Sequence, residues 1–183
     1  MKEEFVFAGF GGQGVMFAGQ LLAYAAMDEG LEVTWMPSYG PEMRGGTAHC
    51  YVVISDQPVG SPLVSRPKTA VVFNVPSFDR YAPLVAPGGL LAYNESLIDR
   101  QTQRRDIAVL PVPASALADT LGDLRLMNVV MLGALLTARP ALPLDALRRA
   151  LELHMPARRR EMLAQNLAAL ERGAAFAADL ALA

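Results

Sequence analysis

The sequence contains 183 residues, which is the size of one ordinary domain with a substantial hydrophobic core. Hydrophobic residues make up 52% of the chain and charged residues 19%, a composition that argues against a disordered protein. The formal net charge is −2 and no basic face is evident, so nucleic acid is not an expected partner.

Neither a membrane segment nor a signal peptide is evident. No apolar run approaches the roughly 20 residues that span a bilayer, and residues 1–4 lack the pattern of a secretory leader. We therefore expect a cytoplasmic protein with no membrane partner. Cys50 is the single cysteine, so the chain alone can form neither a disulfide nor a four-cysteine iron–sulfur cluster. With only two histidines, a zinc site within this chain is also not expected.

The first predicted unit is a buried strand over residues 3–8, a glycine-rich turn over residues 9–14 and a helix over residues 13–29. This order directs backbone N–H groups and a helix N-terminus toward an anion. Glycine lacks a Cβ that would obstruct a phosphate. The candidate site residues of the turn are Gly11, Gly12, Gln13 and Gly14.

The turn satisfies the pattern G-x-G-x-x-G, but that match alone is weakly specific. A dinucleotide fold would also place an acidic residue at the end of the second strand. The predicted second strand covers residues 31–36, and its one acid, Glu32, lies near its start. NAD binding in the usual mode is therefore disfavoured. Three alternatives stay open: a tight turn with no ligand, an anion or nucleotide site, and a subunit-docking site.

Residues 37–46 form the most unusual predicted loop, with two prolines and three glycines that exclude a regular helix. Open α/β sheets place ligand groups in such loops at the carboxyl ends of strands. Arg44 and the two glycines after it suit a phosphate or carboxylate. The alternatives are a partner interface and a loop without a role. The candidate residues are Ser38, Tyr39, Glu42, Arg44, Gly45 and Gly46.

The remaining strands are predicted at residues 47–55, 69–73, 90–93 and 107–110, with a short helix at 78–85 that Ser77 caps. No helix separates the second and third strands, which predicts a mixed sheet. Asn74 and Asn94 follow strands on the edge that carries the glycine turn, where such residues serve as turn or cap residues more often than as ligands.

The last third of the chain is predicted to be helical, with helices at 115–121, 125–138, 143–153 and 158–180. Asn128 lies in the first turn of one of them, where a cap or an interhelix bond is expected. The run Arg158–Arg160 indicates a solvated or subunit-facing patch. Together the elements predict a single domain over residues 1–183, a three-layer α/β/α structure with a largely parallel, partly mixed sheet.

The two glycine-rich stretches, Gly9–Gly14 and Ser38–Thr47, together resemble the gamma subunit of 2-oxoacid:ferredoxin oxidoreductases, the pyruvate/ketoisovalerate oxidoreductase gamma family. Within it, the chain is most similar to the 2-oxoglutarate:ferredoxin oxidoreductase gamma subunit. Asn74 with Pro76, Gly88 with Gly89, and Asn128 with the segment 132–134 also resemble the family pattern. The resemblance spans about residues 4–175, and the paired motifs are far more specific than either alone.

The resemblance implies a subunit of an enzyme complex. Such complexes decarboxylate a 2-oxoacid on thiamine diphosphate with Mg2+, pass electrons through 4Fe–4S clusters to ferredoxin, and transfer the acyl group to coenzyme A (CoA). It further implies that alpha and beta subunits and a ferredoxin-like subunit or domain hold these groups. This chain is then expected to hold no cofactor alone and to have no catalytic residue of its own.

Two hypotheses follow for the chain's role. The first is an accessory gamma subunit that completes the complex. The second assigns the glycine turn and Arg44 to one surface that faces CoA or the cofactor region. The competing classes are a stand-alone nucleotide-binding protein, which lacks the acid at the second strand's end, and a purely structural subunit with no ligand contact.

Overall fold

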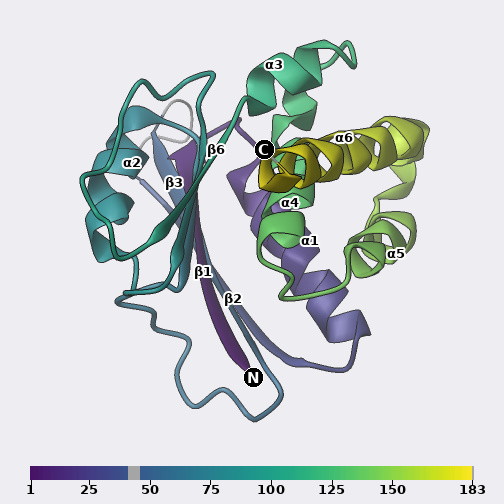
Figure 1. Ribbon diagram of the computed structural model, residues 1–183. Helices are drawn as coiled ribbons and strands as arrows, with labels where there is room; N and C mark the ends of the chain where they lie inside the picture. Colours follow the sequence, from purple (N-terminus) through teal and green to yellow (C-terminus); the bar gives the residue numbers. More distant parts are fainter. Residues whose placement is uncertain (41–45, 183) are drawn as a thin grey trace.

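A twisted six-stranded sheet separates two layers of helices of very different size (Figure 1). The computed structural model describes residues 1–40 and 46–182. The strands are β1 Lys2–Phe10, β2 Glu32–Tyr39, β3 Thr47–Ser55, β4 Thr69–Val72, β5 Leu90–Asn94 and β6 Ala108–Val112. The α-helices are α1 Val15–Asp28, α2 Val75–Tyr81, α3 Ala114–Asp119, α4 Met127–Ala138, α5 Leu144–His154 and α6 Leu163–Leu182. Three 3-10 segments are η1 Ala82–Leu84, η2 Leu124–Leu126 and η3 Ala157–Met162.

The sheet is mixed, with strand order β2-β3-β1-β4-β5-β6. Strands β1, β4, β5 and β6 are parallel to one another, whereas β3 is antiparallel to both of its neighbours. Strand β2 therefore runs in the direction of β1, and β3 alone is reversed. The predicted single α/β domain with a largely parallel, partly mixed sheet is confirmed.

Both edge strands extend beyond their predicted ends. The prediction stopped the second strand at Met36 and the sixth at Leu110, before prolines, but β2 continues through Pro37 to Tyr39 and β6 through Pro111 to Val112. A proline is tolerated in a strand with one unpaired side, because that side needs no N–H donor. Ser38 and Tyr39 are therefore strand residues rather than loop residues.

The predicted cap of the helix after β4 was wrong. Helix α2 begins at Val75, and Asn74 is its N-cap, with its Oδ1 accepting a hydrogen bond from the Ser77 N–H at 2.8 Å. Pro76 fits the first turn of the helix, where an N–H would have no intrahelical partner. The helix therefore starts three residues earlier than the prediction of 78–85.

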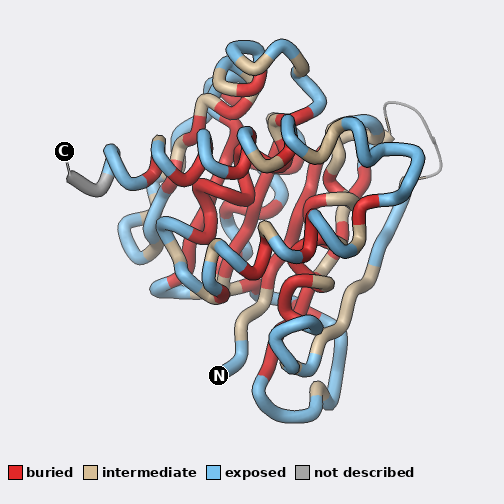
Figure 2. Tube along the Cα trace, turned by 90° about the vertical axis from the view of Figure 1, so that its right-hand side faces the viewer, coloured by how far each residue is buried: buried red, intermediate tan, exposed pale blue. Residues whose placement is uncertain are grey.

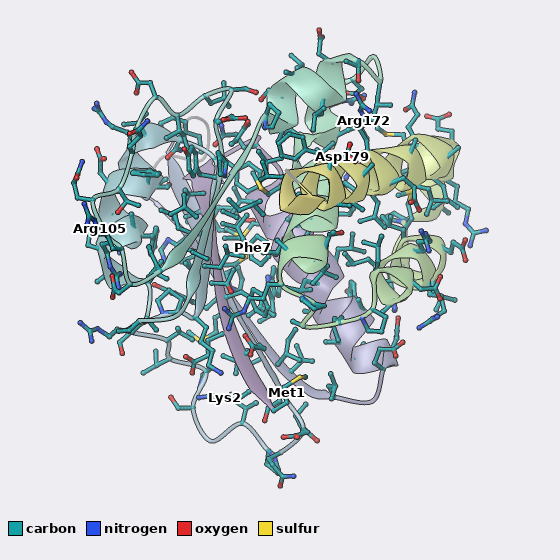
Figure 3. The ribbon with its side chains drawn as sticks, viewed as in Figure 1. Met1, Lys2, Phe7, Arg105, Arg172 and Asp179 are labelled. Atoms are coloured by element: carbon teal, nitrogen blue, oxygen red, sulfur yellow. The ribbon has the colours of Figure 1, made fainter. Side chains whose placement is uncertain are left out.

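The two faces of the sheet carry separate hydrophobic clusters. In β1, Phe5 and Phe7 pack against the large helical layer, while Val6 and Ala8 pack beneath α2, as the two-residue alternation of a strand requires. Figure 3 shows Phe7 in the layer between the sheet and the helices. The burial pattern in Figure 2 places the deepest residues along the sheet and the helices that cover it.

Helices α4 and α6 cross at very close range. An added Cβ at Gly133 would lie 2.0 Å from the Leu170 carbonyl oxygen, and one at Gly173 would lie 1.8 Å from the Val130 carbonyl oxygen. Both obstacles are helix backbone, which cannot rotate away as a side chain can. These two glycines therefore set the distance between the helices, and α4 is buried from Asn128 to Leu136.

We predict that Gly133→Ala lowers the free energy of unfolding by about 1–3 kcal/mol, because the helices must separate to admit a methyl group. Urea unfolding followed by circular dichroism measures the loss. Gly60→Ala is the matched control, since an added Cβ there meets no heavy atom within 4 Å. Equal stabilities of Gly133→Ala and the wild type would contradict the close crossing.

Candidate functional site

The turn between β1 and α1 requires glycine at two positions. Gly12 has φ 100° and Gly14 has φ 74°, a region that side-chain-bearing residues rarely adopt. At Gly14 there is also no room, because an added Cβ would lie 2.0 Å from the Nδ2 atom of Asn128. The same Nδ2 donates a hydrogen bond to the Gly14 carbonyl at 3.1 Å. The predicted interhelix role of Asn128 is thus a bond that joins α4 to the start of α1.

Gln13 fixes the turn to the neighbouring strand. Its Oε1 accepts a hydrogen bond from the Phe10 N–H at 2.7 Å, and its Nε2 donates to the Phe73 carbonyl at 3.1 Å. Both ends of the amide are used within the chain. Among the predicted site residues, Gln13 therefore holds the turn in shape.

The two glycine-rich segments lie side by side at one edge of the sheet. The Gly11 N–H donates a hydrogen bond to the Gly46 carbonyl at 3.0 Å, and the Gly40 N–H donates to the Thr47 carbonyl at 2.8 Å. This is the edge at which β1 and β2 end and β3 begins, as the sequence predicted.

The candidates of the second segment are only partly described. Ser38 and Tyr39 are exposed, and in β2 they pair with His49 and Ala48 of β3. Glu42, Arg44 and Gly45 lie outside the described residues, so the roles predicted for them stay predictions.

Asn74 and Asn94 have internal partners. Asn74 caps α2, while its Nδ2 is buried without a hydrogen-bond partner among the described residues. Asn94 is fully buried; its Oδ1 accepts from the Ser96 N–H at 3.3 Å and its Nδ2 donates to the Ser115 hydroxyl at 2.8 Å. Each therefore makes the turn or cap contacts that were the structural alternative for it.

A cavity of about 390 Å3 opens beside the glycine turn, on the α1 side of the sheet. The turn and the first residues of α1 form one wall, the segment around Arg125 and Asn128 forms a second, and η3 with the start of α6 forms a third. Its polar lining consists mainly of Gly12, Gly14, Arg125, Asn128, Arg159 and Asn166.

The lining of this cavity, called here the glycine-turn cavity, suits an anion. Helix α1 has no side-chain cap and no acidic residue in its first turn, and its first intrahelical bond runs from the Ala18 N–H to the Gly14 carbonyl. The N–H groups before Ala18 and the helix dipole therefore favour negative charge at this end.

Two arginines reinforce this preference. The Arg125 guanidinium is held by Asp123 at 2.7 Å and 2.9 Å, and these hydrogen bonds raise the pKa of Arg125 above its ordinary value. The side chain stays charged and is 76% exposed. Arg159 is exposed on η3 and makes no ion pair with any described residue.

Sequence reasoning missed Arg125 and did not connect Arg159 with the turn. A signal was present for Arg159, because a run of cations near a helix start is electrostatically unfavourable without a nearby anion or partner. Arg125 carried no comparable signal, since only the fold brings η2 to the N-terminus of α1.

Cys50 is a core residue. It is fully buried, its Sγ lies 3.7 Å from the Val15 carbonyl oxygen, and burial raises the pKa of its thiol to about 12. Across residues 1–40 and 46–182, no group of three or more His, Cys, Asp and Glu side chains is arranged to hold a metal ion. None of the helices in these ranges combines the length and apolarity needed to cross a bilayer.

Comparison with known proteins decides the family. Residues 4–176 match the family described as pyruvate ferredoxin/flavodoxin oxidoreductase. The chain belongs to this family. A ketoisovalerate oxidoreductase subunit, VorA of Methanothermobacter thermautotrophicus, is 40% identical over 173 residues, which cover 94% of this chain and 36% of that protein. The chain thus spans about a third of the length of that relative.

Two solved structures share the fold over nearly the whole chain. The gamma subunit of a keto/oxoacid ferredoxin oxidoreductase from Geobacter sulfurreducens has a TM-score of 0.86 and 25% identity, covering 98% of both chains. The 2-oxoglutarate:ferredoxin oxidoreductase from Magnetococcus marinus, solved with 2-oxoglutarate, coenzyme A and succinyl-CoA bound, has a TM-score of 0.87 and 26% identity, covering 97% of this chain and 31% of that one. The predicted resemblance to a gamma subunit is confirmed.

We predict that Gln13→Leu destabilises the fold by about 1–3 kcal/mol, because the Phe10 N–H and the Phe73 carbonyl lose their partner in a partly buried place. Urea unfolding gives the change. Gln165→Leu, at an exposed position of α6, is the control and is expected to lie within about 0.5 kcal/mol of the wild type. If the two variants were equally stable, Gln13 would not be holding the turn.

Proposed function

We propose that this chain is the gamma subunit of a multi-subunit 2-oxoacid:ferredoxin oxidoreductase. The complex would convert a 2-oxoacid and CoA to acyl-CoA and CO2 and reduce ferredoxin. The observation that carries the proposal is the family match over residues 4–176, together with the likeness to a solved gamma subunit over 98% of both chains.

We infer that the chain is not catalytic alone. An iron–sulfur cluster of this kind needs four cysteine ligands, and the sequence has one, which is buried. Thiamine diphosphate, Mg2+ and the 4Fe–4S clusters are assigned to alpha, beta and ferredoxin-like partners, with ferredoxin as the electron acceptor. The chain's own contribution would be a shaped surface at the glycine-rich edge of the sheet.

The glycine-turn cavity is proposed to receive the phosphate groups of CoA. Unpaired helix N–H groups and arginine guanidinium groups bind phosphate oxygens by charge-assisted hydrogen bonds. The chain supplies the N–H groups at the start of α1, beside Gly12 and Gly14, and the guanidinium groups at Arg125 and Arg159. The Magnetococcus marinus structure, to which this chain is similar, holds coenzyme A, which supports the same ligand here.

The proposed 2-oxoacid is 2-oxoglutarate, with 2-ketoisovalerate as the alternative. The similar Magnetococcus marinus enzyme is named as a 2-oxoglutarate oxidoreductase, which supports the first substrate. The 40% identical VorA protein is named as a ketoisovalerate oxidoreductase subunit, which supports the second. Selection between a dicarboxylate and a branched apolar substrate would reside in the subunits that hold thiamine diphosphate.

The test of the proposal is co-purification followed by an activity assay. A tagged chain expressed with the alpha, beta and ferredoxin-like genes of its source is expected to recover all partners and to reduce a viologen dye when given CoA and a 2-oxoacid. Parallel assays with 2-oxoglutarate and 2-ketoisovalerate identify the substrate. Recovery of this chain without partners, or turnover by this chain alone, would overturn the proposal.

We predict that Arg125→Gln in the assembled enzyme raises the apparent KM for CoA about tenfold, with a much smaller change in kcat. One charge-assisted hydrogen bond contributes about 1.5–3 kcal/mol, and about 1.4 kcal/mol corresponds to a factor of ten. Arg44→Ala is expected to act in the same direction, on the sequence argument alone.

The control is Arg172→Gln, at an exposed arginine on α6 outside the cavity (Figure 3). Its KM for CoA should match that of the wild type. If Arg125→Gln instead releases the partner subunits and leaves the KM unchanged in the remaining complex, the cavity is a subunit interface and the assignment to CoA fails.

A further inference from the structure

We propose that two copies of this chain pair through one face of β2 and β3, in a two-fold arrangement that sets Arg80 of each copy against Glu32 of the other. The inference goes beyond the proposed function, since it concerns how many copies of the chain an assembly contains. It does not depend on any ligand of the glycine-turn cavity.

Strands β2 and β3 are covered by a helix on one face only. Helix α1 packs over both strands, whereas α2, on the opposite side of the sheet, packs over β1 and β4 (Figure 1). Among the described residues, no other helix packs extensively on β2 or β3. The α2 side of this strand pair, called here the open face, therefore lacks the second layer that covers the rest of the sheet.

The open face carries uncharged side chains of the kinds that protein interfaces favour. Trp35 of β2 and Cys50 of β3 pack against the α1 side, so the alternation of side chains along a strand puts their neighbours on the open face. Met36 and Tyr51 form a direct cross-strand pair at its centre. Interface cores are enriched in Tyr and Met and depleted in charged residues. The residues of the open face are Thr34, Met36, Ser38, His49 and Tyr51.

His49 adds no charge to the open face at neutral pH. Burial, and to a smaller extent the Arg80 guanidinium, lower the pKa of His49 below its ordinary value, so the ring is neutral at pH 7. The His49 ring packs edge-on against Tyr51, with centroids 5.5 Å apart, and lies 6.0 Å from the Tyr81 ring. A second surface of the same kind can therefore cover this face without burying an unpaired charge.

One cation and one anion lie at opposite ends of the open face. The Arg80 guanidinium carbon lies 5.2 Å from the centre of the Tyr81 ring, at the end that holds His49. Glu32 begins β2 at the other end, six residues before Ser38, which is about 20 Å at roughly 3.3 Å per residue. Both charged residues are exposed, and neither forms an ion pair with a described residue.

Opposite charges at opposite ends make the open face complementary to itself. In a closed two-fold pair, both copies contribute the same patch, and a contact from residue i to residue j occurs twice. A two-fold axis across the middle of the patch, at right angles to the line from Arg80 to Glu32, brings Met36 and Tyr51 of the two copies together. The same axis forms two contacts between Arg80 and Glu32. Charges of one sign at both ends would instead repel a second copy.

Pairing through the face is favoured over pairing through the edge of β2. Pro37 has no N–H group, so it removes a donor that an added strand would use. Two sheets that pack face to face lie about 10 Å apart and join through side chains alone. The side chains of the open face, rather than the backbone of β2, therefore determine the pairing.

The test is sedimentation equilibrium of the full chain over a range of concentrations, where we expect the wild type to show a monomer–dimer equilibrium. Glu32→Arg and Arg80→Glu should each raise the dimer dissociation constant about tenfold, because one reversal turns both symmetry-related contacts from attraction to repulsion. The double variant, Glu32→Arg with Arg80→Glu, restores opposite charges and should return the dissociation constant close to that of the wild type.

Two further variants separate the open face from general charge effects. Arg172→Glu reverses an exposed charge on α6, in the other helical layer, and should leave the dissociation constant unchanged. Met36→Asp puts a charge at the centre of the patch and should abolish the dimer. Circular dichroism checks that each variant is folded. The two charge reversals are at exposed positions, so they keep the test decisive if Met36→Asp folds poorly.

Three outcomes would overturn the inference. They are a wild-type chain that stays monomeric at every concentration, a dimer that neither reversal weakens, and a double variant that does not regain the dimer. If the reversals release alpha or beta subunits from the co-purified complex while the chain alone is monomeric, the open face binds a different polypeptide and the inference fails. The co-purification and turnover test does not depend on these results, so failure here is distinguishable from failure of the gamma-subunit proposal.

Discussion

The contact between Gly14 and Asn128 is the constraint on which the candidate site depends. Gly14 must have a positive φ to turn the chain from β1 into α1, and it must lack a Cβ so that the Asn128 amide can reach its carbonyl. One hydrogen bond thus joins residues 114 positions apart in sequence. It sets the start of α1 against α4 and brings the Arg125 segment to the edge of the turn.

The helical layer that supplies Asn128 is closely packed for a separate reason. Helix α4 is buried from residue 128 to residue 136, and glycines on α4 and α6 allow the two backbones to approach closely. A tightly packed helix pair resists small displacements. The walls of the glycine-turn cavity that come from η2, η3 and α6 are therefore positioned by packing far from the cavity.

Sequence patterns predicted the order of the elements, the mixed sheet and the meeting of the two glycine-rich segments at one edge. They could do so because strand periodicity, the glycine turn and the missing crossover helix between residues 36 and 47 are local features. The predicted strand ends at Pro37 and Pro111 were wrong, because an edge strand can contain a proline and a central strand rarely can. Local sequence does not show which strands lie at the edges of the sheet.

Local sequence patterns could not predict the glycine-turn cavity. Arg125 and Arg159 are distant in sequence from the turn, and only the packing of α4, α5 and α6 brings them to it. Gln13 shows the converse limit. Its place in a glycine motif suggested a ligand contact, yet its amide is occupied by the Phe10 N–H and the Phe73 carbonyl. Spacing predicts where a residue lies, whereas its partners decide what its side chain is free to do.

The prolines at the two edges also bear on how this chain can join others. Strands β2 and β6 are the two edges of the sheet, and each contains a proline, which has no N–H group. An additional strand would therefore find fewer hydrogen-bond donors at either edge. Continuous sheets running from one polypeptide into the next are therefore disfavoured at both ends. We therefore expect association to use helix surfaces, sheet faces and the loops at the strand ends, where side chains rather than main-chain ladders determine which partner fits.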